Sequence, residues 1–149
     1  MTNVFAIIVT YNGAKWISKC LQSVADSTIP VKILVVDNGS DDNTRQKIKE
    51  DFPAAELIVS DLNIGFGQAN NMGIKKAYAD GASHFFLLNQ DAWIEQDTIE
   101  KLVAQQQKNK EYGVLSPLHL NGQGMALDFE FSTCIVPSKC PGLYSDFCL

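Results

Sequence analysis

The first candidates for chemistry are two aspartates that follow apolar stretches of the chain. Asp37 comes directly after the run Val31–Val36, and Asp91 comes three residues after the run Phe85–Leu88. A carboxylate in such a place can ligate a hard divalent cation, or it can serve as an ordinary turn or cap residue. Which role applies depends on where the surrounding elements carry these side chains.

Four short apolar runs predict the strands that would position them. Continuous or nearly continuous apolar runs of this length are typical of strands buried on both faces of a parallel sheet. The expected strands are Val4–Val9, Val31–Val36, Leu57–Val59 and Phe85–Leu88.

Helical patterns lie between and after these runs. The first has apolar residues at Ile17, Cys20, Leu21 and Val24, and the last at Ile99, Leu102 and Val103. Between them we expect helices over residues 41–51, with Ser40 as the N-cap, and over 68–80. Alternating strands and helices predict an α/β fold, an open and mostly parallel sheet with helices on both faces. Such a sheet binds its ligand outside the carboxyl ends of its strands.

Composition limits the classes of function. The chain has 149 residues with a formal net charge of −5, which predicts one domain and argues against nucleic acid as a partner. Four cysteines without metal-ligand or CxxC spacing suggest reduced thiols. No stretch of this chain has the length of an integral membrane segment, so any membrane association through it would be peripheral. The oligomeric state stays open.

Polar residues follow all four predicted strands, in the segments "TYNG", "DNGSDDNT", "SDLNIGFGQANNMG" and "NQDA". Together they resemble the family 2 inverting glycosyltransferases of the GT-A fold, and within them the rhamnosyltransferase-like branch. The matching stretches are "VTYN" (9–12), "VVDNGSDDNT" (35–44), "NIGFGQANNMGI" (63–74) and "LLNQDA" (87–92). The resemblance covers the first two-thirds of the chain. A different α/β enzyme, such as a dehydrogenase or nucleotidyltransferase, is disfavoured because no glycine-rich phosphate loop opens the first helix.

The resemblance implies a site for a nucleotide-diphosphate-sugar donor. Thr10 and Tyr11 would belong to the base pocket, and Asp37 would contact the base or ribose. Asp91 would bind Mg²⁺ or Mn²⁺ that bridges the donor diphosphate, with Asn89 in the place of the first carboxylate of the usual Asp-x-Asp. The complete set of expected donor-binding residues is Thr10, Tyr11, Asn12, Asp37, Asn38, Gly65, Asn70, Asn71 and Asn89.

The later part of the chain lacks an expected catalytic group. Residues 1–112 carry the βα repeats, whereas 113–149 predict short strands and loops, with a hairpin turn at Asn121-Gly122. The family's general base lies in a later acidic region, and Asp128, Glu130 and Asp146 do not match it. Asp128 is better explained as a surface strand residue. We therefore expect a truncated GT-A domain whose base lies beyond residue 149.

The expected function is transfer of a sugar, with inversion, to a hydroxyl of a glycan or lipid-linked acceptor, assisted by a divalent metal. The alternative is a non-catalytic fragment that binds nucleotide and metal but lacks the acceptor half. The expected location is the cytoplasm, with peripheral association at the cytoplasmic face of the membrane.

Overall fold

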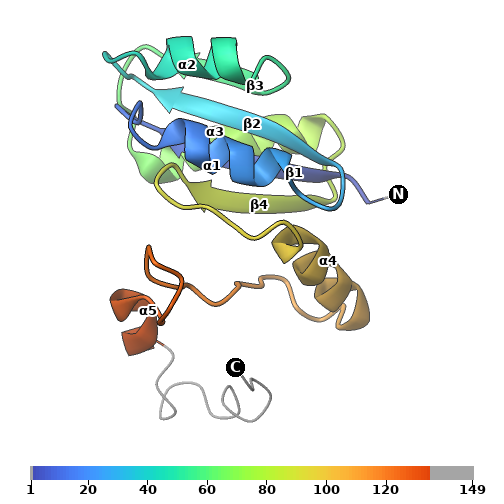
Figure 1. Cartoon of the computed structure of the whole chain (residues 1–149). Helices are drawn as coiled ribbons and strands as arrows, with labels where there is room; N and C mark the ends of the chain where they lie inside the picture. The colour runs from blue at the N-terminus through green and yellow to red at the C-terminus, as the bar shows by residue number, and fades with distance from the viewer. Residues whose placement is uncertain (1, 135–149) are drawn as a thin grey trace. The chain divides into compact units, whose positions relative to one another are not determined.

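The computed structural model describes residues 2–134, without the side chains of Glu130 and Cys134 (Figure 1). Asp146 lies outside the described residues. The chain divides after Gly113 into two compact units, which are described separately.

The first unit alternates strands and helices along its whole length. All strands pair in parallel, in the order β3-β2-β1-β4. The predicted parallel α/β sheet is thus confirmed. Its elements are β1 (Val4–Thr10), α1 (Ile17–Ala25), β2 (Val31–Asn38), α2 (Thr44–Asp51), β3 (Glu56–Ser60), α3 (Phe66–Ala79), β4 (His84–Asn89) and α4 (Thr98–Lys108).

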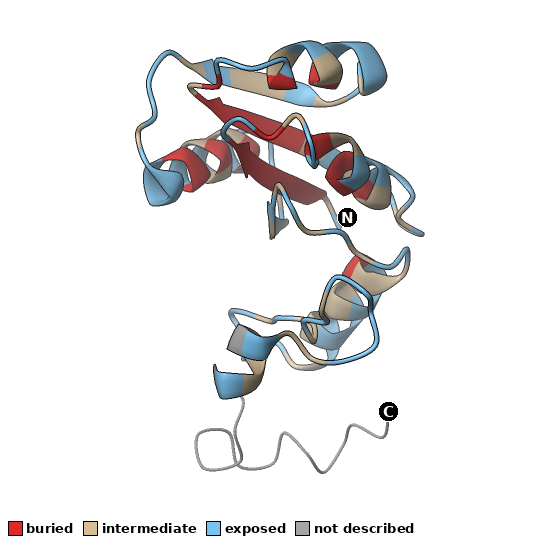
Figure 2. Ribbon diagram, turned by 60° about the vertical axis from the view of Figure 1, so that its left-hand side comes forward, coloured by how far each residue is buried: buried red, intermediate tan, exposed pale blue. Residues whose placement is uncertain are grey.

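The core lies on both sides of the central strands, which Figure 2 shows as buried. Successive side chains of a strand point to opposite faces. On one face Ala6 and Ile8 pack with residues of α1, α2 and α4, and on the other Ile7 packs with α3. α3 approaches closely because Gly73 has no side chain: a Cβ there would lie 2.6 Å from Cγ2 of Ile7.

The two outer strands are less buried than their apolar runs predict. Phe85 is 39% exposed and Leu87 is 49% exposed, and β4 alternates between partly buried and exposed side chains. Phe85 and Leu87 lie on the face of the sheet that α3 covers. Because α3 packs mainly over β1 and β2, these two side chains of β4 remain accessible. β3 is likewise partly exposed at Val59. The prediction that these runs are buried on both faces was therefore wrong.

Two helices begin at different residues from those expected. α2 begins at Thr44 rather than Asp41, and Ser40 is not its N-cap. Asp42 instead accepts hydrogen bonds from the backbone N–H and the hydroxyl of Thr44. Burial tends to raise the pKa of Asp42, but these hydrogen bonds outweigh it and the pKa is lowered. α3 begins two residues earlier than expected, at Phe66.

The second unit contains a loop and a short helix. An antiparallel bridge between Leu120 and Leu127 closes a loop that includes the expected turn at Asn121 and Gly122. The helix α5 (Phe129–Cys134) follows where strand was predicted. Asp128 precedes this helix, and its carboxylate accepts the Phe131 N–H at 3.1 Å. Asp128 is therefore a residue at a helix start, and its assignment to a strand was wrong.

Candidate functional site

A cavity of about 370 Å³ lies at the carboxyl ends of the strands. Because these ends meet at one edge of a parallel sheet, polar residues far apart in the sequence come together there. Four of the predicted residues contribute to it: Tyr11, Asn38, Asn89 and Asp91. The complete lining is Val9, Tyr11, Asn38, Asn63, Phe66, Asn89, Gln90 and Asp91.

A second depression, of about 500 Å³, lies near the amino ends of β1 and β2. Its lining includes Thr2, Pro30 and Lys32 but no carboxylate. Although it is larger, it lies at the edge of the sheet where parallel α/β folds do not usually bind ligands. The cavity at the carboxyl edge is therefore the candidate site.

Two aromatic side chains line this cavity, and both are accessible. Tyr11 is 45% exposed and Phe66 is 58% exposed. Phe66 opens α3 directly after Gly65, whose φ of 84° and ψ of 153° lie in a region that is almost restricted to glycine. Gly65 thus shapes the loop without itself lining the cavity. Phe66 was not predicted as a site residue, although it lies inside the quoted segment "NIGFGQANNMGI".

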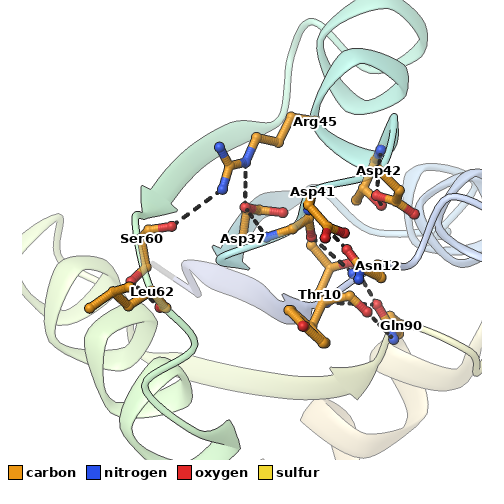
Figure 3. Close-up of polar contacts among 12 residues, drawn as sticks. Thr10, Asn12, Asp37, Asp41, Asp42, Arg45, Ser60, Leu62 and Gln90 are labelled. Atoms are coloured by element: carbon orange, nitrogen blue, oxygen red, sulfur yellow. Dashed lines mark hydrogen bonds and ion pairs between the residues drawn. The ribbon is translucent and has the colours of Figure 1, made fainter.

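Gln90 fixes the position of Tyr11. Its Oε1 accepts hydrogen bonds from the Thr10 hydroxyl at 2.6 Å and from the Tyr11 N–H at 3.0 Å. Its Nε2 donates to the Tyr11 carbonyl at 3.2 Å. Gly13 leaves room for this amide, because a Cβ there would lie 2.2 Å from Oε1 of Gln90. Thr10 itself is fully buried and lies outside the cavity lining. Figure 3 shows Thr10 beside Gln90, its hydrogen-bond partner.

Asp37 is also fully buried and lies outside the lining. Its Oδ1 accepts the Ser40 N–H at 3.1 Å and forms an ion pair with Nε of Arg45 at 2.5 Å. Nη2 of Arg45 donates to the Ser60 carbonyl at 3.3 Å, as Figure 3 shows. The second oxygen of Asp37, Oδ2, is buried and has no hydrogen-bond partner within the described chain. Sequence reasoning did not predict the role of Arg45.

Asn12 and Asn38 hold neighbouring loops together. Asn12 has a positive φ of 48°, a conformation that asparagine tolerates better than most residues. It accepts the Asp41 N–H at 3.0 Å and donates its own N–H to the Ser40 hydroxyl. Asn38 donates to Oδ1 of Asn63 and accepts the Ile64 N–H, both at 2.9 Å. Of the two, Asn38 lines the cavity.

Asn70 and Asn71 lie in α3, away from the cavity lining. Nδ2 of Asn70 donates to the Phe66 carbonyl at 3.0 Å, so this buried side chain is used within its own helix. Asn71 is exposed. The structure therefore does not bring these two amides together with the other predicted residues.

Asp91 presents a free carboxylate to the cavity. It is exposed, and within the described chain it has no hydrogen-bond or ion-pair partner. Residues 2–134 contain no cluster of three or more His, Cys, Asp or Glu side chains around a possible metal position. One carboxylate fits Mg²⁺ or Mn²⁺ only where phosphate oxygens and water complete the coordination. The residues present fit a cation that binds together with a diphosphate.

Cys20 lies behind this part of the site. Its thiol donates to the Asn89 carbonyl at 3.4 Å. Burial, together with the negative charge of Asp91, raises the pKa of Cys20 to about 12. The thiol is therefore neutral at pH 7 and acts as a packed donor beneath the end of β4.

The described residues contain no helix that is long and apolar enough to cross a bilayer. This finding concerns residues 2–134 alone.

Comparison with known proteins shows that the chain is similar to glycosyltransferases. It is 40% identical over 81 residues to the glycosyltransferase AglE of Haloferax volcanii, covering 50% of this chain and 26% of AglE. It is 36% identical over 76 residues to the N-acetylglucosaminyl-diphospho-decaprenol L-rhamnosyltransferase of Mycobacterium tuberculosis, covering 50% of this chain and 25% of that protein. These matches thus span about a quarter of each relative's length.

A solved structure of a glycosyltransferase is also similar to this chain. The mannosyltransferase PcManGT from Pyrobaculum calidifontis, in complex with GDP-Man and Mn²⁺, superposes with a TM-score of 0.61 at 25% identity, covering 70% of this chain and 32% of that one. The GT-A fold and the likeness to rhamnosyltransferases expected from the sequence are confirmed. The model of the family described as "Glycosyl transferase family 2" matches residues 5–129. This chain belongs to glycosyltransferase family 2.

Proposed function

We propose that this chain is the donor-binding part of an inverting glycosyltransferase, which moves a sugar from a nucleotide-diphosphate-sugar to a hydroxyl of a glycan or lipid-linked acceptor. The observation that carries the proposal is a single cavity, at the carboxyl edge of the sheet, that combines two accessible aromatic side chains with a free carboxylate. GDP-Man bound to PcManGT supports the donor class. The name of the mycobacterial relative, which contains a diphospho-decaprenol, supports a lipid-linked acceptor.

The aromatic side chains of Tyr11 and Phe66 supply the part of the site that suits a nucleobase. Aromatic rings provide apolar contact area and favourable stacking geometry for a flat ring system. Gln90 holds the backbone of Tyr11 from both its N–H and its carbonyl, so this part of the wall is positioned before a ligand arrives. The amides of Asn63 and Asn89 add polar groups to the same cavity.

Asp91, with the Asn89 amide beside it, would hold Mg²⁺ or Mn²⁺ against the donor diphosphate. The bound cation would neutralise the charge that develops on the departing diphosphate. The Mn²⁺ bound with GDP-Man in PcManGT supports this assignment. Within this chain, Asp91 would bind the cation, and Asn89 would orient polar groups at the same strand end.

An inverting transfer also needs a general base that deprotonates the acceptor hydroxyl. Asp128 is engaged at the start of α5, where it accepts the Phe131 N–H. We therefore propose that the base is a residue other than Asp128. The engagement of Asp128 also favours a second candidate, in which this chain alone binds nucleotide and metal without turnover. We further propose that the enzyme works at the cytoplasmic face of a membrane, where a lipid-linked acceptor would be available.

Calorimetric titration tests the proposal. UDP, dTDP and GDP are added to this chain with and without Mn²⁺, and we expect at least one of them to bind about tenfold or more tightly with the metal. Asp91→Ala removes the metal-dependent part of the affinity. Glu95→Ala is the matched control, because Glu95 is an exposed carboxylate of the same loop outside the cavity lining.

If neither Mn²⁺ nor the substitution Asp91→Ala changes the nucleotide affinity, the metal assignment is contradicted. Absence of binding for all nucleotides contradicts the donor site itself. A turnover assay with a glycan or lipid-linked acceptor separates the two candidates, since transfer by this chain alone would reject the binding-only alternative.

A further inference from the structure

We propose that Asp37 and Arg45 form a positioning pair that sets the segment 60–65, and through it the cavity residues Asn63 and Phe66. This inference rests on the proposed function and deepens it. It differs from the expectation that Asp37 touches the donor, since it makes Asp37 act through Arg45.

The first observation is that Asp37 is buried away from the cavity. Its side chain is fully buried, and it does not line the cavity that collects Tyr11, Asn38, Asn89 and Asp91. Its Oδ1 already accepts from the Ser40 N–H and from Arg45. A ligand in the cavity would therefore meet neighbouring residues before it met this carboxylate.

The second observation is that the guanidinium of Arg45 joins the ends of β2 and β3. Nε binds Asp37, where β2 ends, while Nη2 donates to the carbonyl of Ser60, the last residue of β3. Figure 3 shows the side chain of Arg45 reaching from α2 to both partners. The planar fork of arginine allows two directed contacts at once, which the single ammonium of lysine does not reproduce.

A second attachment holds the other end of the same segment. Asn38 donates to Asn63 and accepts the Ile64 N–H. Gly39 lets the two loops approach, since a Cβ there would lie 2.8 Å from the backbone N of Asn63. Segment 60–65 is thus bound at both ends to the end of β2, and α3 begins with Phe66 directly after it.

The charge of Asp37 explains why the pair must stay intact. A buried carboxylate without a cation is strongly unfavourable, and Oδ2 of Asp37 already has no hydrogen-bond partner in the described chain. Loss of Arg45 would therefore favour a local rearrangement that gives the carboxylate access to water. Such a rearrangement would release Ser60 and loosen the loop that carries Asn63.

Hydrogen exchange followed by mass spectrometry tests the pair without any nucleotide. In Arg45→Lys we expect the amides of segment 60–65 to exchange about tenfold faster, because the ion pair survives but the bridge to Ser60 is lost. Arg45→Gln should show a larger effect. Lys76→Gln is the control: it removes exposed ion pairs that α3 makes to Glu56, at the start of β3, and to Asp80. Amides of β1 should stay protected in all three variants.

Unchanged exchange at 60–65 in both Arg45 variants overturns the proposal. Circular dichroism shows whether each variant folds, and if Arg45→Gln does not, Arg45→Lys carries the test because it keeps the buried charge paired. This readout remains valid even if the wild-type chain binds no nucleotide, an outcome that would reject the proposed function but leave the positioning pair standing.

A double-mutant cycle in nucleotide binding separates positioning from contact. If Asp37 acts through Arg45, the variant Asp37→Asn/Arg45→Gln binds UDP no more weakly than the worse single variant. Asp37→Asn then weakens UDP and N3-methyl-UDP by the same factor. A loss that is confined to UDP and adds to that of Arg45→Gln would show that Asp37 contacts the imide N–H, and would overturn the proposal.

Discussion

The hydroxyl of Thr10 donates a 2.6 Å hydrogen bond to Oε1 of Gln90, and so joins the end of the central strand β1 to the loop that follows β4. Thr10 is fully buried, whereas Gln90 reaches the cavity. In the segment "NQDA" two adjacent residues thus have different tasks: Gln90 fixes the frame of the site, and Asp91 offers its carboxylate.

Gln90→Ala should destabilise the chain, because it leaves the buried Thr10 hydroxyl without its acceptor. The expected loss in free energy of unfolding is about 1–3 kcal/mol, the usual cost of an unsatisfied buried polar group. Urea denaturation measures it. Gln90→Glu keeps an acceptor for Thr10 and for the Tyr11 N–H, so its loss should be smaller. Equal losses in both variants would argue against this explanation.

Gly73→Ala should weaken the packing of α3 on the sheet. The added Cβ would lie 2.6 Å from Cγ2 of Ile7 and 3.3 Å from Cγ2 of Val36, so the helix must shift. Overpacking of this kind costs about 1–3 kcal/mol, which outweighs the better helix propensity of alanine. Gly67→Ala in the same helix meets open space and should be neutral or stabilising in the same denaturation experiment. A Gly73→Ala variant as stable as wild type would disprove the close approach.

Cys20 should make stability fall at high pH. Its pKa is raised from 9.0 to about 12 in the folded state, so its contribution is fully present below pH 9 and is lost as the pH rises toward 12. Between pH 9 and 10.5 the wild type should lose about 2 kcal/mol relative to Cys20→Ala, since one pKa unit corresponds to about 1.4 kcal/mol. Urea denaturation of both proteins at several pH values, under reducing conditions, measures this difference. A stability gap that does not change with pH would contradict the burial of the thiol.

Much of the fold and part of the site could be predicted from the sequence. The apolar runs and the helical periodicities between them were sufficient for a parallel α/β sheet, because both patterns are local. The carboxyl ends of the parallel strands then had to meet at one edge, which is why Tyr11, Asn38, Asn89 and Asp91 line one cavity. Phe66 could have been proposed too, since it follows the glycine that opens α3.

Other features depend on contacts that no local pattern contains. Phe85 and Leu87 read as buried, yet strand order places β4 at an edge of the sheet and leaves both accessible. Thr10 and Gln90 lie 80 positions apart, so their hydrogen bond exists only once β1 and β4 pair.

The sequence by itself determined the family, the alternation of strands and helices, and the strand ends at which polar residues gather, because residue type and spacing encode these directly. The tertiary structure alone decided which polar side chains reach the cavity and which are used inside the protein. Asp37 illustrates the difference. Its position at a strand end could be predicted from the sequence. Its burial and its ion pair with Arg45 arise from how α2 packs beside β2 and β3.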